Sequence, residues 1–308
     1  MSNLSIDSTA LNNYTASLVK SSVFPDSSFL SKFTNLSAYL NGRHIEFPFY
    51  TNATGTITKN GSSFTSDDIS QTEQDSVTFN LDIYRVKPFL ITAFENEIIN
   101  WDKAQMEITQ NLTYLENYVA NQVIKSLVLD RDVAFDVLTT GANGTANGAD
   151  GVTAKKKIQY ADFLALKKVM DKSNLKGERN LIVDAETFSE ILGDTKLSSY
   201  LETSYASVVE GTYPKIAGIN IIERSEVCAL SSSGTVKIVE LGDTMIASDI
   251  RVSLAFIGDA VGLGMGTPKV FNTLSPQFYG NVTSAEVAFG VKNLRSDKKG
   301  VYIIKQQG

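Results

Sequence analysis

The sequence predicts a mixed α+β fold that has long projecting elements as well as a compact region. Three observations lead to this prediction. Residues 43–86 alternate polar and apolar side chains in two legs, residues 88–128 repeat apolar side chains at three- and four-residue steps, and helices and strands alternate further on. A helix of about 35 residues spans about 50 Å, which is too long for one compact globule. We therefore expect an obligate assembly in which neighbouring copies bury the projecting parts.

Residues 1–42 form the first predicted part, an N-terminal arm rich in Ser, Asn and Thr. An extended β-hairpin loop follows at 43–87, and the apolar side chains of each leg are predicted to share one face: Ile45, Phe47 and Phe49, then Val77, Phe79, Leu81 and Ile83. Pro48 suits an edge strand because it has no backbone N–H. The polar stretch between the legs is longer than an ordinary loop, and such loops are usually functional.

Residues 88–151 are predicted to be a peripheral domain dominated by one long helix. The apolar stripe of this helix comprises Phe94, Ile98, Trp101, Ile108, Leu112, Leu115 and Val119. Pro88 stands near its start, where proline is tolerated. The Gly- and Asn-rich stretch 141–151 is predicted to be a flexible loop.

Residues 152–275 are predicted to be a mixed α/β domain. We expect a helix near 158–172, a buried strand at Leu181–Val183, and a short helix whose N-cap is Asp184. Three apolar segments after this helix are expected to be strands. Residues 276–308 then close the chain as two strands joined by a Ser-Asp-Lys-Lys-Gly turn.

The composition excludes several classes of function. Lys and Arg number 28 and Asp and Glu number 34, so the net charge is −6, which argues against duplex nucleic acid as the main ligand. Cys228 and His44 are the only residues of their kinds, which excludes an intramolecular disulfide, a Cys-pair zinc site and a multi-His metal centre. The sequence predicts neither a secretory signal nor a membrane-spanning segment, so no contact with a membrane is expected.

The motifs that resemble binding loops are weak. The glycines at 262–266 do not have dinucleotide-loop spacing, and Pro268 blocks the helix that would hold a phosphate, so we predict a plain loop. Asn143 begins a stretch like a calcium loop, but the twelfth position is Ala154 instead of the required Glu. We therefore predict no catalytic residue, no cofactor and no metal ion.

The isolated reactive side chains fit structural roles. Cys228 lies among apolar residues and is predicted to be a buried, unreactive thiol. His44 is expected to lie at a surface or to pack on a strand. The run Lys155–Lys157 is predicted to be a solvated edge, with contact to a polyanion as the alternative. The carboxylates at 67–68 and 130–132 do not indicate acid–base catalysis without a pocket.

The order of the elements resembles the major capsid proteins of tailed bacteriophages, the Hong Kong 97 capsid fold family. The resemblance covers nearly the whole chain. The hairpin resembles the extended loop, the long helix the spine helix, and LDIYRVKPFLIT the junction between them. Residues 152–275 resemble the axial domain, within which LKGERNLIVDAETFSEIL and TYPKIAGINIIERSEV look like recurrent segments of the family. Residues 276–308 resemble the closing strands of the peripheral domain.

The resemblance implies a structural protein without catalysis. Such a protein self-assembles into hexamers and pentamers of an icosahedral phage head, or virion capsid, that encloses the DNA genome. Assembly in the cytoplasm of a bacterial host is implied, with a portal, possible decoration proteins and a separate scaffolding protein, since the arm is too short to contain one. Some members crosslink a Lys of the extended loop to a distant Asn. Lys59 and Asn293 are the candidates here, and no acidic partner is identified.

Three alternatives remain open at this stage. An encapsulin-type nanocompartment shell shares the fold and encloses an enzyme instead of DNA. A hydrolase that uses carboxylates of the middle domain would be a compact particle with a deep pocket. A secreted adhesin is disfavoured because the sequence predicts no secretory signal.

Overall fold

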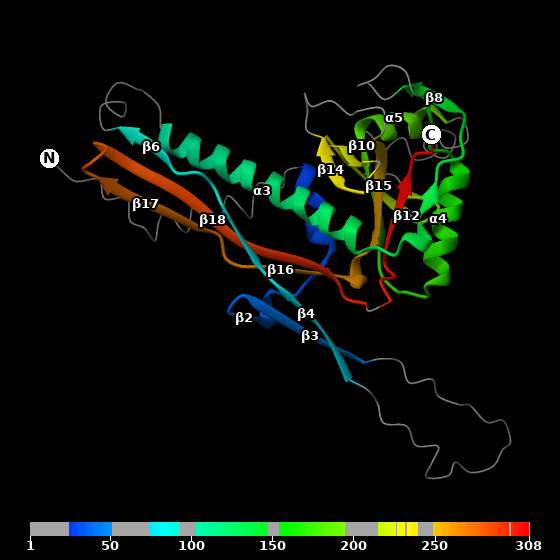
Figure 1. The fold of residues 1–308 in the computed structure, drawn as a ribbon, viewed down its shortest axis with the longest axis horizontal. Coiled ribbons are helices and arrows are strands. Elements are labelled where there is room, and N and C mark those ends of the chain that lie inside the picture. The colour runs from blue at the N-terminus through cyan, green and yellow to red at the C-terminus, as the bar shows by residue number, and fades with distance from the viewer. Residues whose placement is uncertain are drawn as a thin grey trace, which may run out of the picture.

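The computed structural model describes residues 25–50, 74–92, 103–146, 154–194, 215–225, 227–231, 233–239, 249–295 and 297–307. The described part contains two main sheets. Figure 1 shows an elongated sheet with the long helix α3 lying along it, and a more compact body around a second sheet at the end of α3. The mixed α+β fold predicted from the sequence is confirmed.

The elongated sheet has six strands and is organised around β18 (Gly280–Asn293). The other strands of this sheet are β1 (Thr34–Asn35), β5 (Asp82–Arg85), β6 (Phe89–Thr92), β16 (Val261–Met265) and β17 (Lys269–Ser275). One edge of β18 pairs with β16 and β17, and its other edge pairs with β5 and β6. Because β18 has 14 residues, it can serve two partners in succession on each side.

The long helix is α3 (Lys103–Asp130), whose 28 residues span about 42 Å. Its buried face packs on β18, and the buried apolar side chains of the helix are Ile108, Leu112, Leu115, Val119, Ala120, Val123, Ile124, Leu127 and Val128. The prediction of a helix from residue 88 was wrong at its start. Residues 89–92 form strand β6, because this apolar, β-branched run pairs with β18. The predicted stripe residues Phe94, Ile98 and Trp101 lie outside the described residues.

The second sheet has eight strands in the order β11-β12-β10-β15-β13-β14, with β19 paired to β15 and β7 paired to β19. Its strands are β7 (Val137–Leu138), β10 (Arg179–Asp184), β11 (Lys215–Ile216), β12 (Ile219–Arg224), β13 (Val227–Leu230), β14 (Val236–Val239), β15 (Ile250–Ile257) and β19 (Val301–Lys305). Helices α4 (Tyr160–Lys172) and α5 (Ala185–Gly193) pack beside it. Asp184 caps α5 as predicted, accepting a hydrogen bond from the Thr187 backbone N at 3.2 Å.

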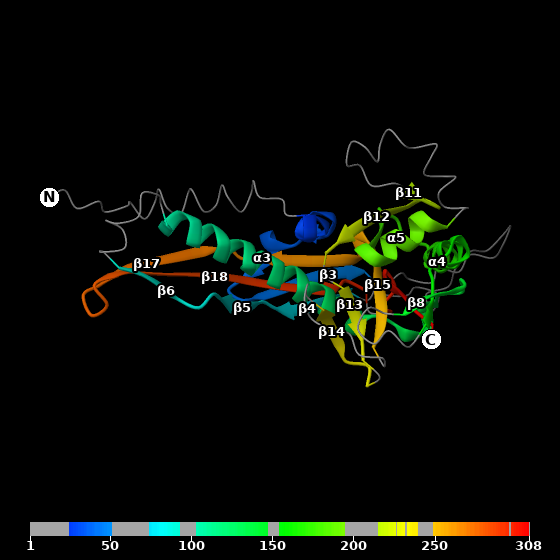
Figure 2. The same ribbon diagram turned by 90° about the horizontal axis from the view of Figure 1, so that it is seen from above.

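The predicted hairpin is present as β3 (His44–Tyr50) and β4 (Gln74–Asn80), with β2 (Leu40–Asn41) beside β3. Residues 51–73 lie outside the described residues. β2 pairs with β3 only at residues 44–45, so Pro48 lies where β3 has a described neighbour only in β4. Figure 2 shows β3 and β4 beside the elongated sheet, opposite the side where the short helix η1 (Pro25–Lys32) lies.

The second leg of the hairpin departs from the predicted alternation. The ladder breaks at Leu81, which is buried, and β5 then pairs with β18 instead of β3. After the break Tyr84 packs against the core, whereas Ile83 is 36% exposed. The prediction that Ile83 shares the face of Leu81 was therefore wrong, because the break reverses which side faces inward.

Three further predictions need correction. Asn143–Ala146 forms strand β8 and pairs with β9 (Ala154–Lys156), so the predicted flexible loop contains a strand. Gly262 and Gly264 of the segment predicted as a loop lie in strand β16, and Gly266 directly follows it. The two closing strands exist, but β18 lies in the elongated sheet and β19 in the eight-stranded sheet, so they do not pair with each other.

The predicted boundary at residue 275 does not coincide with a boundary between the sheets. Strands β16 and β17 precede that boundary and belong to the elongated sheet, and β19 follows it and belongs to the eight-stranded sheet. The reason is that the chain enters and leaves each sheet more than once. The short helices η2 (Ser37–Tyr39), η4 (Val133–Phe135) and η5 (Gly258–Ala260) lie at these crossings.

Candidate assembly surfaces and the joint between the sheets

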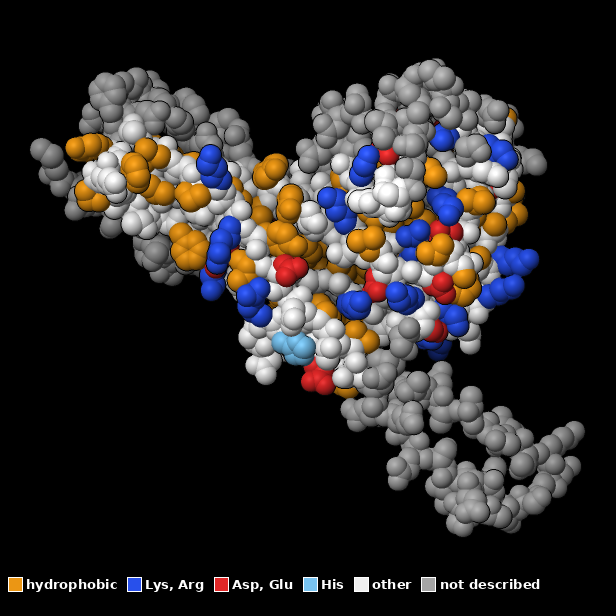
Figure 3. Space-filling model, in the orientation of Figure 1, with side chains coloured by type: hydrophobic (Ala, Val, Ile, Leu, Met, Phe, Trp, Pro, Cys, Tyr) orange, Lys and Arg blue, Asp and Glu red, His pale blue; other side chains and the backbone are white. Residues whose placement is uncertain are grey.

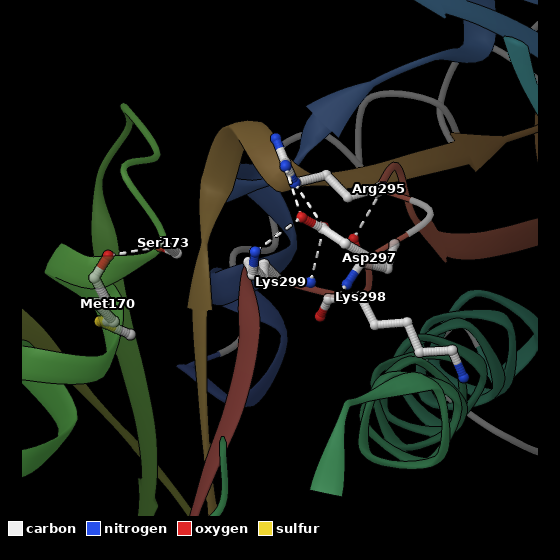
Figure 4. A network of polar contacts seen from close by, with 7 residues as sticks. Met170, Ser173, Arg295, Asp297, Lys298 and Lys299 are labelled. Atoms are coloured by element: carbon white, nitrogen blue, oxygen red, sulfur yellow. Dashed lines mark hydrogen bonds and ion pairs between the residues drawn. The ribbon is translucent and has the colours of Figure 1, made fainter. Parts of the chain in front are cut away.

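The chain passes from the elongated sheet to the eight-stranded sheet through the turn after β18. Asn293 is buried at the start of this turn, and its side-chain Nδ2 donates to the Lys298 carbonyl oxygen at 2.9 Å. Its Oδ1 accepts from the Arg295 backbone N at 3.1 Å. Figure 4 shows Arg295 and Lys299 on either side of Asp297, to which both are ion-paired. The hydrogen bond from Arg295 holds the pKa of Asp297 well below its usual range. The turn is therefore held by its own side chains.

The C-terminal end of α3 is tied to the same turn. Asp130 forms ion pairs with Lys292, whose Nζ lies 3.1 Å away, and with Lys298, whose Nζ lies 3.7 Å away. An acidic side chain is unfavourable at a helix C-terminus, where the partial charge is negative, so the two lysines offset that repulsion. The arrangement joins the helix to both ends of the turn.

A second ion-pair group joins α3 to the eight-stranded sheet. Arg131 Nε lies 2.9 Å from Asp136 Oδ1, and Lys305 Nζ lies 3.2 Å from Asp136 Oδ2. The Asp136 side chain is 5% exposed, so it depends on these two cations for compensation of its charge. We call the two ion-pair groups around Asp130 and Asp136 the joint, because together they connect α3, β18 and β19.

The other end of the elongated sheet exposes large apolar side chains. The exposed fractions are 49% for Phe271, 72% for Leu274, 51% for Phe278, 82% for Tyr279 and 40% for Leu90. These residues come from β17, from the turn between β17 and β18, and from β6, and we call them the apolar tip. Figure 3 shows hydrophobic side chains gathered at this end of the molecule.

The backbone presents Tyr279 outward in an unusual conformation. Its φ is +52°, in the left-handed region that aromatic residues rarely adopt. The next residue must be glycine, because a Cβ on Gly280 would lie 2.1 Å from the carbonyl oxygen of Ile91 on β6. Left-handed backbone at a non-glycine residue often marks a functional site. An aromatic ring that is mostly exposed and held this way is suited to insertion into a partner's surface.

The glycine segment at 262–266 has a packing role. A Cβ on Gly264 would lie 2.1 Å from Ile45 Cδ1, so glycine allows β3 of the hairpin to pack directly on β16. Leu36, Ile45, Leu81 and Leu294 form a buried apolar cluster there. The glycines thus anchor the base of the hairpin to the elongated sheet.

The side chains that the sequence analysis considered one by one do not come together in a common site. Cys228 is buried, and burial raises the pKa of its thiol to about 12, as expected of an unreactive thiol. His44 is exposed and its Nδ1 lies 2.9 Å from Asn80 Oδ1, which confirms a surface position. Lys155 is buried, Lys156 donates to Gln307 and Lys157 is exposed, so the predicted solvated edge is wrong for Lys155.

The predicted carboxylates also lie apart. Asp130 belongs to the joint, and Asp132 accepts from the Ala134 backbone N at 3.0 Å as the N-cap of η4. Asp67, Asp68 and Lys59 lie outside the described residues. Asn293 is present but committed to its own turn. Sequence reasoning missed the apolar tip, although the aromatic pair next to Gly280 was a signal for an exposed turn.

Within the described ranges, no three His, Cys, Asp or Glu side chains are grouped so as to hold a metal ion. In the same part of the chain, no helix combines the length and the apolar character needed to cross a membrane.

No family model matches this sequence, and no curated protein matches it. Solved structures do. The capsid of Ralstonia phage GP4 matches with a TM-score of 0.64 and 9% identity, over 90% of this chain and 87% of that one. Cyanophage Pam1 capsid matches with a TM-score of 0.61, 15% identity and coverage of 89% and 87%. A structure from Mycobacterium phage Che8 matches with a TM-score of 0.60, 15% identity and 90% of both chains. The chain has the Hong Kong 97-like fold of phage capsid proteins.

Proposed function

We propose that the protein is the major capsid protein of a tailed bacteriophage, forming hexamers and pentamers of an icosahedral head around the DNA genome. The observation that carries the proposal is the fold, which corresponds to phage capsid structures over 89–90% of this chain. The role is structural and involves no catalysis. Its location is the virion, after assembly in the cytoplasm of a bacterial host.

Each region has a place in this proposal. The apolar tip supplies contact with neighbouring copies, because burying exposed apolar surface favours association. The hairpin, the N-terminal arm of residues 1–42 and the axial domain around the eight-stranded sheet supply further contacts. Many weak contacts, repeated around a closed shell, give a stable assembly. A separate scaffolding protein, a portal and possible decoration proteins are the proposed partners, with packaged DNA adjacent.

An encapsulin-type shell is the alternative. The structures that match include capsids of Ralstonia phage GP4 and cyanophage Pam1, which favours the phage head. The contents of a purified shell distinguish the two functions, because a phage head contains DNA and a nanocompartment contains an enzyme.

The test is assembly of the purified protein, alone and with a co-expressed scaffolding protein, followed by light scattering and electron microscopy. Closed shells or rings of six and five subunits are the expected products. A compact monomer under both conditions would contradict the proposed function and favour the hydrolase alternative.

Variants test the contribution of the apolar tip separately. Leu274→Ser combined with Tyr279→Ser should leave the subunit folded and reduce shell yield at least about tenfold. Leu129→Ser, a change at an exposed leucine on α3 outside these proposed contact regions, is the matched control and should assemble normally. Normal assembly of the double variant would remove the tip from the proposal without affecting the capsid function.

A further inference from the structure

A small cavity lies in the compact body around the eight-stranded sheet, between α5, β15 and the end of β19. About 10 Å³ of it is open to the centre of a water molecule. Polar side chains that line it include Thr187 and Glu190 on α5, Arg251 and Ser253 on β15, and Gln306 directly after β19. A cavity of this size is large enough for one water molecule, provided that two to four polar groups surround it.

Two buried side chains at this cavity each have an atom without a hydrogen-bond partner. Arg251 is 6% exposed and Gln306 is 7% exposed, and among the residues that the structure describes neither Arg251 Nε nor Gln306 Oε1 has a hydrogen-bond partner. Buried polar groups in folded proteins nearly always have a protein or water partner. Because the residues of this donor and this acceptor line the same cavity, one small ligand there can serve both.

The Arg251 side chain is held by its two terminal nitrogens, and the backbone of Gln306 is held beside Arg251. Arg251 Nη1 lies 3.8 Å from Asp184 Oδ2, and Nη2 is ion-paired with Glu186. The Gln306 backbone N donates to the Arg251 carbonyl oxygen at 3.1 Å. The two backbones are therefore joined directly, while the side chains meet at the cavity.

The charge around the cavity favours a neutral ligand. The Arg251 guanidinium disfavours a cation, and the nearby carboxylates of Asp184, Glu186 and Glu190 disfavour an anion. A water molecule accepts from Arg251 Nε–H and donates to Gln306 Oε1, which satisfies both groups. Ser253 and Glu190 also line the cavity and offer further polar groups for the remaining hydrogen and lone pair of such a water.

We propose that this cavity binds one ordered water molecule that bridges Arg251 and Gln306 and anchors the residues after β19 to β15 and α5. The inference is independent of the proposed capsid function, because it concerns the inside of a single subunit. It gives the C-terminal residues a defined attachment in addition to the hydrogen bond from the Gln307 backbone N to Thr139 Oγ1 at 3.0 Å.

The direct test is a structure of the wild-type protein, as a crystal or an assembled shell, at a resolution that shows ordered water. The expected result is a density peak about 2.6–3.2 Å from both Arg251 Nε and Gln306 Oε1. An empty cavity, or a direct contact between the two side chains, would overturn the proposal. This readout needs no variant.

Two variants test the anchoring role. Gln306→Leu removes the acceptor, so the water peak should disappear and the amide hydrogen of residue 306 should exchange at least about tenfold faster. Gln306→Glu keeps an acceptor and should retain both the peak and the slow exchange. Equal exchange rates in all three proteins would show that the water has no anchoring role.

Discussion

Strands β15 and β17 lie in different sheets of one chain and have opposite environments. Seven of the eight residues of β15 are buried, whereas five of the seven residues of β17 are exposed. β15 has neighbours on both edges, namely β10 and β13 on one side and β19 on the other. β17 pairs only with β18 among the described residues. The comparison shows that β15 is enclosed by its own subunit, whereas β17 leaves apolar side chains exposed, and this difference is the basis for proposing the apolar tip as a contact surface.

The largest expected effect comes from the buried strand. Phe256 on β15 is fully buried and its ring centroid lies 4.6 Å from that of Phe33. Phe256→Ala should lower the free energy of unfolding by about 3–5 kcal/mol, through lost burial and the cavity that remains. Chemical denaturation of the unassembled subunit measures this. A loss below about 1 kcal/mol would mean that the two strands differ less than their burial indicates.

The second-largest loss of stability is expected at the joint. Asp136→Ala removes the carboxylate between Arg131 and Lys305 and leaves two cations without compensation. Because Arg131 and Asp136 are largely buried, we expect a loss of about 3 kcal/mol. The control is Asp297→Ala in the more exposed ion pair of the turn, which should cost about 1 kcal/mol or less. Equal losses in the two variants would contradict the distinction between joint and turn.

A smaller effect depends on pH. Burial raises the pKa of Glu190 above 4.5, so the folded state binds this proton more readily than the unfolded state does. At a pH above the raised pKa, ionised Glu190 therefore lowers the free energy of unfolding. This loss of stability disappears as the pH falls through the raised pKa toward 4.5 and the carboxylate is protonated. Glu190→Gln removes this dependence.

The measurement is the difference in unfolding free energy between wild type and Glu190→Gln at pH 7 and at pH 5. The variant should gain stability relative to wild type at pH 7, and the difference should shrink at pH 5. If the stability difference between the variant and the wild type were larger at pH 5 than at pH 7, the raised pKa of Glu190 would be contradicted.

The smallest effect on the isolated subunit is expected at the apolar tip. Phe271 on β17 is 49% exposed, and Phe271→Ala repeats the change made at Phe256 in an exposed environment. The free energy of unfolding should change by about 0.5 kcal/mol or less, while assembly is weakened. A large loss of stability would show that the tip is part of the subunit's own core.

Local sequence signals were sufficient for elements whose partners are near in the chain. The alternation in the two legs predicted the hairpin, and the Asp184 cap predicted the start of α5. They failed where pairing with a distant strand decided the outcome. Phe89–Thr92 has the apolar character of a buried helix segment as well as of a strand, and only β18, almost 200 residues later, makes it a strand.

The sequence by itself determined the mixed α+β class, the extended character of the hairpin and of α3, and the exclusion of an intramolecular disulfide, because these follow from periodicity and composition. The order of elements also predicted the capsid fold. Only the tertiary structure decided that β18 and β19 belong to different sheets, that the glycines of β16 accommodate Ile45, and that an aromatic turn is exposed. Exposure and charge pairing depend on which segments meet in space, and single-sequence periodicity does not contain that information.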